Sequence, residues 1–238
     1  MSFFEKIFGS KKQTNETKKQ HVTQDKMVNE EVKTEQTGPV ITVAREFGSG
    51  GREIAEKVAE KLNFKFYDKE QIVKAAKENG IDTELFEQVD ESHMDKFWFT
   101  VSKMAYDIPS DSNSFDIKVS NDKMFMIQSD AIRELAKKGS AVFVGRCASY
   151  ILRNKAKKIF IIAEMDDRVK RIEKRYKLSK DEAKHLIETA DKKREKYYDY
   201  YTNSKWNDVN NYDLVINVSE TGIDGAVEKI IKFVNDNT

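Results

Sequence analysis

The chain is poor in the residues that form disulfides and zinc sites. Its 238 residues include one cysteine, Cys147, and three histidines, His21, His93 and His185. A single cysteine excludes an intramolecular disulfide, and so few histidines leave no cluster with zinc-binding spacing. This composition is typical of proteins in the reducing cytoplasm, and we expect a cytoplasmic protein.

Long apolar stretches and a strong net charge are also missing. No apolar run approaches the length of about 20 residues that spans a bilayer, and the N-terminus lacks a signal-peptide core, so we expect no transmembrane segment. Lysine and arginine (42 residues) nearly balance aspartate and glutamate (41 residues), which gives a net charge of +1. This balance argues against nucleic-acid binding driven by overall charge, and we expect no nucleic-acid partner.

The first 38 residues differ in composition from the rest. Aliphatic residues are few between Gly9 and Gly38, so this segment has too little apolar surface to offset the entropy of ordering it. We predict a disordered N-terminal tether at residues 1–38 and one domain at residues 39–238. Residues 1–8 contain three phenylalanines and one isoleucine, and they form either a frayed terminus or a weak membrane or partner anchor.

A glycine cluster between a β-branched run and an amphipathic stretch is the feature most indicative of function. Val40, Ile41 and Val43 favour a buried strand, and apolar residues recur at helical spacing from Ile54 to Leu62. Glycines between them allow positive φ and close approach of phosphate oxygens, while the amides that open the helix face the same point. The pattern predicts a phosphate-binding loop formed by Gly48, Ser49, Gly50, Gly51 and Arg52.

This loop lacks the lysine of the usual phosphate-loop motif, G-x-x-x-x-G-K-[ST]. When the helix is aligned without gaps, Gly51 stands at the lysine position and Arg52 at that of the hydroxyl residue. The dinucleotide motif G-x-G-x-x-G also fails, because Glu53 stands at its last glycine. The glycines alone would fit an ordinary turn, but the flanking Arg45 and Arg52 favour an anion site.

Apolar runs and amphipathic stretches alternate through the rest of the domain. Further strands are predicted at residues 64–67, 141–144, 159–163 and 214–218. Further helical segments are predicted at residues 69–78, 124–138, 166–201 and 225–234. Apolar strands separated by helices indicate a parallel sheet covered on both faces. Residues 82–120, with scattered aromatics and a polar stretch, predict a helical insert with a loose loop.

Polar groups follow several of the predicted strands, at the edge where parallel sheets bind ligands. Arg146 comes directly after a buried strand, where a guanidinium without an anion partner would be desolvated, so we expect it to bind an anion. Cys147 beside it is expected to be a packing residue. Asp68 either caps the following helix or hydrogen-bonds the hydroxyl or base of an acceptor.

A basic segment runs from Arg168 to Lys196, with twelve lysines and arginines against six acids. It is either a solvated helical hairpin with ion pairs or a flexible lid whose arginines close over a polyphosphate. Arg168 and Arg171 are spaced to lie along one helix face.

In this order, the elements resemble the cytidylate kinase-like branch of the P-loop nucleoside monophosphate kinases over about residues 39–235. The resemblance is carried by ITVAREFGSGGREIAEKVAEKL, FYDKEQI, QSDAIRELAKKGSAVFVGRCASYIL, IFIIAEMDDRVKRI, the D-x-x-R-x-x-YY run at 191–198, Trp206 and NYDLVIN. It implies a P-loop NTPase-type α/β fold with a five-stranded parallel sheet and helices on both faces. It also implies an acceptor insert at about 82–120, a lid at about 166–201, and transfer of the ATP γ-phosphoryl group, with Mg²⁺, to CMP or dCMP.

The resemblance also implies roles for individual residues, and none of them is a metal ligand. Binding of the donor phosphates is implied for Gly48, Ser49, Gly50, Gly51, Arg52, Arg168 and Arg171. Binding of the acceptor nucleoside monophosphate is implied for Asp68, Lys123 and Arg146. Stabilisation of transition-state charge is implied for Arg52, Lys193 and Arg194. The Thr221–Gly222 segment is expected beside the adenine.

The absent lysine leaves three alternatives open. In the first, the protein is an active phosphotransferase in which Arg52 serves the donor phosphates and Ser49 reaches metal-bound water. In the second, it is a nucleotide-binding regulatory module that lost catalysis with the lysine. In the third, it is a kinase of another small acceptor.

Overall fold

The computed structural model describes residues 38–78 and 114–236. The chain divides into two units, residues 1–35 and residues 36–238. The predicted tether, the predicted anchor at residues 1–8 and most of the predicted insert lie outside the described residues. The tether, insert and lid boundaries therefore stay predictions.

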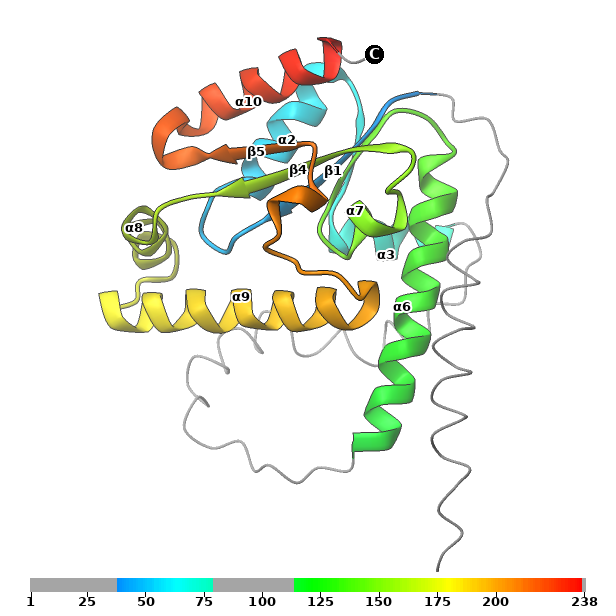
Figure 1. Cartoon of the computed structure of the whole chain (residues 1–238), viewed down its shortest axis with the longest axis horizontal. Helices are drawn as coiled ribbons and strands as arrows, with labels where there is room; N and C mark the ends of the chain where they lie inside the picture. Colours follow the sequence, from blue (N-terminus) through cyan, green and yellow to red (C-terminus); the bar gives the residue numbers. More distant parts are fainter. Residues whose placement is uncertain (1–37, 79–113, 237–238) are drawn as a thin grey trace, which may run out of the picture. The chain divides into compact units, whose positions relative to one another are not determined.

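Five parallel strands form the central sheet of the second unit (Figure 1). They are β1 (Val40–Arg45), β2 (Lys65–Tyr67), β3 (Ala141–Val144), β4 (Ala156–Ile162) and β5 (Leu214–Asn217). Their spatial order is β2-β3-β1-β4-β5, and every neighbouring pair is parallel. The predicted α/β fold with a five-stranded parallel sheet is confirmed.

Helices cover both faces of this sheet. The helices are α2 (Gly51–Leu62), α3 (Lys69–Glu78), α6 (Ser114–Ala136), α7 (Ala148–Ile151), α8 (Met165–Tyr176), α9 (Lys180–Thr202) and α10 (Val218–Asp236), with a short 3₁₀ helix at Val209–Asn211. On one face, α2 and α10 bury Ile54, Val58 and Ile230 against the sheet. On the other, α3, α6 and α7 share a core with Phe143. Burial of these apolar faces supplies the main favourable free energy of the fold.

Several element boundaries differ from those predicted. Helix α6 begins at Ser114 rather than Met124, so it takes up the end of the predicted insert. Helix α10 begins at Val218 rather than Gly225 and is broken at Gly222, whose φ of 68° and ψ of 174° are not helical. Helix α7 was not predicted, because one turn of helix gives too short a pattern to read.

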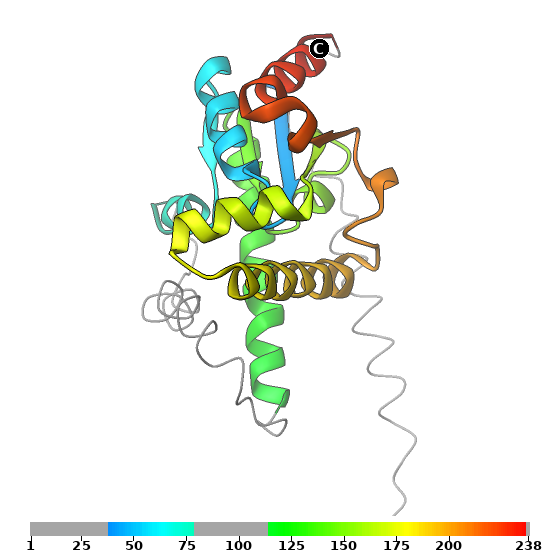
Figure 2. The same ribbon diagram turned by 90° about the vertical axis from the view of Figure 1, so that its left-hand side faces the viewer.

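The predicted helical segment at 166–201 is two helices, α8 and α9. Lys177, with φ 56°, ends α8 in the left-handed conformation. Ser179 then begins α9 with a capping box, in which its hydroxyl accepts from the Glu182 amide and the Glu182 carboxylate accepts from the Ser179 amide. Figure 2 shows the two helices side by side at one end of the sheet.

This arrangement brings the carboxyl ends of β1, β3 and β4 to one edge. Because the strands are parallel, the glycine loop after β1, the turn after β3 and the start of α8 after β4 meet there. Within residues 38–78 and 114–236, no helix has the length and hydropathy of a membrane-spanning segment.

Candidate functional site

The glycine loop between β1 and α2 has the backbone conformation expected from its sequence. Gly48 and Gly50 have φ values of 82° and 87°, which side chains other than hydrogen disfavour. Ser49 is fully buried: its hydroxyl donates to the Glu46 carbonyl at 2.9 Å and accepts from the Gly51 amide at 3.3 Å. The hydroxyl therefore holds the loop in shape, and the predicted contact of Ser49 with metal-bound water would require it to leave these partners.

The first turn of α2 is open toward ligands. The residue before the helix, Gly50, has no side chain to cap it. Apart from the Gly51 amide, which donates to the Ser49 hydroxyl, the amides of this turn are therefore available to an anion. Arg171 of α8 lies over the loop, where its Nη1 donates to the Gly48 carbonyl at 3.3 Å. A Cβ atom on Gly50 would lie 2.2 Å from this Nη1 and 2.6 Å from Ile223 Cδ1. The loop is thus enclosed by α8 and by the start of α10, next to Thr221–Gly222.

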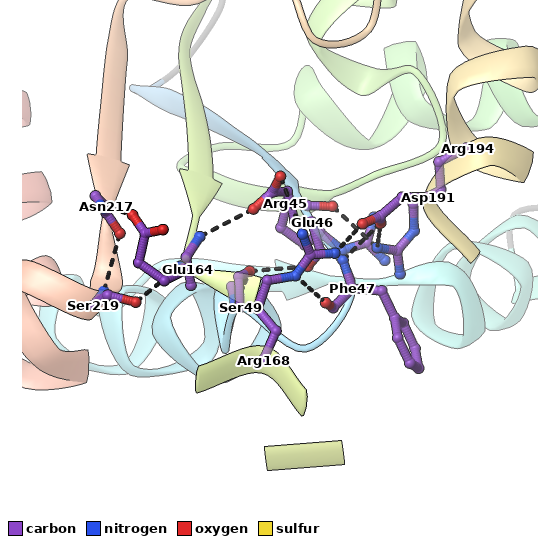
Figure 3. A network of polar contacts seen from close by, with 12 residues as sticks. Arg45, Glu46, Phe47, Ser49, Glu164, Arg168, Asp191, Arg194, Asn217 and Ser219 are labelled. Carbon is purple, nitrogen blue, oxygen red and sulfur yellow. Dashed lines mark hydrogen bonds and ion pairs between the residues drawn. The ribbon is translucent and has the colours of Figure 1, made fainter. Parts of the chain in front are cut away.

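Arg168 ties the glycine loop to both basic helices (Figure 3). Its side chain, in a residue that is 5% exposed, donates from Nε to the Phe47 carbonyl at 2.8 Å and pairs with Glu46 at 3.3 Å and with Asp191 of α9. Asp191 also accepts from the Phe47 amide at 2.7 Å. We call Glu46, Phe47, Arg168 and Asp191 the loop clamp. Every guanidinium nitrogen of Arg168 is engaged within it, so its predicted role toward donor phosphates stays a prediction.

Arg52 points toward β2 rather than over the loop. Its Nε and Nη2 donate to Asp68 at 3.0 and 2.8 Å, and its Nη1 donates to Glu56 at 3.1 Å. Asp68 in turn accepts from the Gln71 amide at 3.1 Å, so the capping alternative for Asp68 is present. A role of Arg52 on donor phosphates would require it to leave two carboxylates.

A small pocket lies between β1, β3 and α9. Its volume is about 60 Å³. Three arginines line it, Arg45 from the end of β1, Arg146 from the turn after β3, and Arg194 from α9. We call it the arginine pocket; the other lining residues are Thr42, Val43, Ala44, Gly145, Cys147, Ser149, Tyr197, Tyr198 and Trp206. Arg194 Nη1 also donates to the Arg45 carbonyl at 3.1 Å.

The turn that carries Arg146 has an unusual backbone. Gly145, Arg146 and Cys147 have φ values of 74°, 55° and 55°. For residues other than glycine this left-handed conformation costs on the order of 1–2 kcal/mol each. Burial raises the pKa of the Cys147 thiol to about 12, so Cys147 packs as a neutral group. The strained turn directs Arg146 into the pocket.

The charges in this pocket oppose one another. Burial, and after it the charges of Arg194 and Arg146, lower the pKa of Arg45 to about 9, and the charges of Asp191 and Asp68 offset only part of this. Burial also lowers the pKa of Arg194, although Asp191 partly compensates. The pocket therefore favours an anion.

The remaining predicted residues divide between this site and its surroundings. Arg146 and Arg194 line the pocket, whereas Lys193 is exposed on α9. Lys123 belongs to α6, but its side chain is outside what the structure describes. From the sequence, Tyr197 is expected only to pack in the core or the lid, and no role is assigned to Thr42. The sequence signal that pointed to the arginine pocket was Arg45, a cation directly before the glycine loop.

The residues near the loop do not fit a metal held by the protein. Within the described residues, no group of three or more histidine, cysteine or acidic side chains could hold an ion. The carboxylates closest to the loop, those of Glu46, Asp68 and Asp191, are paired with arginines. The steps proposed below therefore involve residues of the chain alone.

Comparison with known proteins gives consistent results. Residues 40–220 match the family model of the cytidylate kinase-like family. The chain is 28% identical over 204 residues to the cytidylate kinase of Methanocaldococcus jannaschii, covering 83% of this chain and 98% of that protein. It is 29% identical over 199 residues to the cytidylate kinase of Pyrococcus horikoshii, covering 83% and 88%. Among solved structures, an uncharacterized protein from Eubacterium ventriosum is similar, with a TM-score of 0.62 and 28% identity over 83% of this chain and 98% of that one.

Proposed function

Since this chain belongs to the cytidylate kinase-like family, we propose that it transfers the γ-phosphoryl group of ATP to a nucleoside monophosphate, with CMP and dCMP as the expected acceptors. The observation that carries the proposal is the meeting of two anion sites at one sheet edge. The glycine loop follows β1, and the arginine pocket lies between the ends of β1 and β3. Phosphoryl transfer requires donor and acceptor phosphates to lie side by side.

The donor phosphates bind to the glycine loop in this proposal. The open amides of α2 and its helix dipole favour the negative charge, and Arg171 stands over the loop at Gly48 and Gly50. The adenine lies toward Thr221–Gly222, because Ile223 already packs against the loop.

The acceptor binds on the β2 and β3 side. Arg146 provides the bidentate partner for the acceptor phosphate. Asp68, held by Arg52 at 2.8 Å, faces the acceptor nucleoside.

The chemical step is an in-line displacement. An oxygen of the acceptor phosphate forms a bond to the γ-phosphorus, while the bond from this phosphorus to the β–γ bridging oxygen breaks and its electron pair stays on ADP. The charge on the three equatorial oxygens needs positive donors, and Arg194 is the donor that α9 places nearest to the pocket.

In this proposal the basic helices act as a lid over the glycine loop. Opening α8 and α9 away from the loop would break the Arg168–Glu46 pair and the hydrogen bond from the Phe47 amide to Asp191. We expect this opening to admit and release nucleotides, and the protein to work in the cytoplasm.

A regulatory nucleotide-binding module is the second candidate. It is favoured by Gly51 at the lysine position and by the internal use of the Ser49 hydroxyl. This module would bind ATP or CMP without forming ADP.

Release of ADP by the full-length chain, measured by a coupled assay, tests the proposal. The acceptors are CMP, dCMP, UMP, AMP and GMP, followed by small alcohols. Sustained release with one acceptor over many turnovers excludes the regulatory module. Release with none of the nucleoside monophosphates contradicts the proposed function.

Two variants then separate the roles within the site. Arg146→Ala should raise KM for the acceptor, and Arg194→Ala should lower kcat by roughly 100-fold or more, as removal of a charge-stabilising donor does. Lys193→Ala distinguishes Lys193 from Arg194. Because Lys193 is exposed, its loss should lower kcat far less than the loss of Arg194. The exposed Lys192 provides the matched control on the same helix.

A further inference from the structure

Two glycines on neighbouring elements mark the course of the Arg45 side chain. A Cβ atom on Gly51 would lie 2.5 Å from Arg45 Cβ and 3.0 Å from its Cγ, so the Arg45 stem runs past the first turn of α2. A Cβ atom on Gly145 would lie 2.2 Å from Arg45 Nη1, so the guanidinium ends beside the turn after β3. Both positions require glycine as long as Arg45 keeps this course.

This course explains why the phosphate-loop lysine is absent. Gly51 stands at the position of that lysine, and a side chain there would begin in the space that the Arg45 stem occupies. Because the closest approach is between the two Cβ atoms, arginine, like any other residue with a side chain at position 45, excludes lysine at position 51.

The Arg45 guanidinium lies among other cations without a carboxylate in its pocket. Of the described residues, those that line the arginine pocket include three arginines and no acidic side chain. The three arginines are half-buried, and Arg194 pairs at 3.2 Å with Asp191, which does not line the pocket. Three guanidinium groups held this close together are costly unless a further anion joins them. This contrasts with Arg168, which has two carboxylate partners.

Two buried hydroxyl groups lie in the same pocket, those of Thr42 and Tyr197. Among the described residues, Thr42 Oγ1, in a residue that is 1% exposed, has no hydrogen-bond partner. Tyr197 Oη lies beside Arg146: burial raises the Tyr197 pKa overall, although this guanidinium lowers it. Buried hydroxyls are nearly always hydrogen-bonded in native proteins, and an oxyanion with several acceptor oxygens would accept from the hydroxyls and the guanidinium groups together.

The size of the pocket limits what can fill it. A water molecule occupies roughly 10–15 Å³ on this measure, so a volume of about 60 Å³ admits a few waters or one tetrahedral oxyanion. The pocket is only partly enclosed, so the rest of a ligand can extend out of it. The pocket therefore fits a single phosphoryl group.

We propose that Arg45 supplies the phosphate-binding cation that the absent lysine would otherwise supply, and that Arg45, Arg146 and Arg194 together bind the phosphoryl group between donor and acceptor. Arg45 suits this role because its stem passes α2, on the donor side, and its guanidinium ends beside Gly145, on the acceptor side. The inference deepens the proposed function and rests on it.

Binding of inorganic pyrophosphate and inorganic phosphate to the full-length chain tests this without requiring catalysis. Isothermal titration calorimetry should detect binding to the wild type and a loss of affinity of at least about tenfold in Arg45→Met, since a charge-assisted hydrogen bond is lost. Arg175→Met is the matched control, because Arg175 is exposed on α8 with its guanidinium 5.5 Å from the Tyr176 ring. Equal affinities of Arg45→Met and wild type, or no binding to the wild type, would overturn the inference.

Moving the cation from position 45 to position 51 tests whether arginine at 45 has taken the place of lysine at 51; we call this replacement the exchange. Arg45→Gly should bind pyrophosphate weakly, and Gly51→Lys alone should also be impaired, because its Cβ would meet Arg45 Cβ at 2.5 Å. The double variant Arg45→Gly/Gly51→Lys removes that Cβ and should bind at least about tenfold more tightly than Arg45→Gly. A double variant that binds no better than Arg45→Gly contradicts the exchange. Circular dichroism establishes that each variant is folded.

The two proposals fail in different ways. If pyrophosphate binding depends on Arg45 but no acceptor leads to ADP release, the replacement of the lysine by Arg45 is supported and the phosphotransferase is rejected. ADP release that continues at the wild-type rate in Arg45→Met would support the phosphotransferase and reject the exchange.

Discussion

The loop clamp and the arginine pocket lie at the same edge of the sheet and use the same residue type in opposite ways. In the clamp, Arg168 pairs with Glu46 and Asp191 and donates to the Phe47 carbonyl. In the pocket, Arg45 meets two other arginines and no lining carboxylate among the described residues. Arginine is a structural residue in the first region, and we propose that it binds a ligand in the second.

The difference lies in where the compensating charge is found. A buried cation needs an anion, and the clamp contains its own anions within the fold. In the pocket, Arg194 shares Asp191 with the clamp at 3.2 Å, whereas Arg45 and Arg146 have no carboxylate among the lining residues. We therefore expect the stability of the pocket to depend on a bound anion. Opposite effects on stability are therefore expected when the central arginine of each region is removed.

Replacing Arg168 with methionine should give the largest loss of stability. The change removes the cation that Glu46 and Asp191 share, while Asp191 keeps Arg194 at 3.2 Å and Glu46 keeps the Ala163 amide at 3.0 Å. We therefore expect a cost of about 3 kcal/mol in the free energy of unfolding, the low end for a broken buried ion pair. Urea denaturation followed by circular dichroism measures this. Lys170→Met on the same helix is the control, because the Lys170 side chain is 75% exposed and should change stability by less than about 0.5 kcal/mol. Equal midpoints for the two variants would mean that the clamp contributes nothing.

Replacing Arg45 with methionine should stabilise the free protein, by about 1–3 kcal/mol. The pKa of Arg45 is lowered to about 9 in the folded state from 12.5, so the unfolded chain holds the proton more tightly. The cost of the charged group is thus fully present at pH 7 and declines as the pH rises above about 9.

Saturating pyrophosphate should remove this advantage of Arg45→Met, because the ligand stabilises only the protein that binds it. Thermal unfolding with and without pyrophosphate, at pH 7 and pH 10, measures both effects. If Arg45→Met is less stable than the wild type in the absence of ligand, Arg45 has a structural role like that of Arg168.

Replacing Gly145 with alanine should separate ligand binding from stability. The alanine must adopt the φ of 74°, and this backbone strain costs about 1–2 kcal/mol in the free energy of unfolding. Its Cβ would lie 2.2 Å from Arg45 Nη1 and must push the guanidinium away. Pyrophosphate affinity should therefore fall as far as in Arg45→Met. Gly225→Ala provides a control, since its new Cβ would lie 3.5 Å from the closest neighbour, in ordinary contact. If Gly145→Ala binds pyrophosphate normally, the guanidinium does not act from the place described.

Local sequence patterns were enough to predict the scaffold of both regions. The apolar run at Ala141–Val144 and the helix at Lys69–Glu78 have the bounds predicted for them. Arg146 was predicted to meet an anion because it follows a buried strand, and it lines the arginine pocket. These inferences depend on neighbours in sequence, which the pattern contains.

The partners of individual arginines could not be predicted in the same way. The spacing of Arg168 and Arg171 was enough to predict that they lie on one face of a helix. The pairing of Arg168 with Asp191 could not be predicted, because Asp191 also accepts from the Phe47 amide of the loop, 144 positions away in the sequence. The course of Arg45 past Gly51 and Gly145 depends on side-chain packing between three elements. Helix periodicity contains no information about either.

Replacing Ser179 with alanine should give the smallest effect. It removes the capping box at the outer end of α9, where the Ser179 hydroxyl accepts from the Glu182 amide at 3.4 Å, and should cost about 0.5–1 kcal/mol. Pyrophosphate affinity should not change, because Arg194 and Tyr197 lie near the other end of the helix. Calorimetry and urea denaturation on one preparation compare the two quantities. A parallel loss of affinity would mean that α9 responds as one rigid body, so that its cap helps to position the arginine pocket.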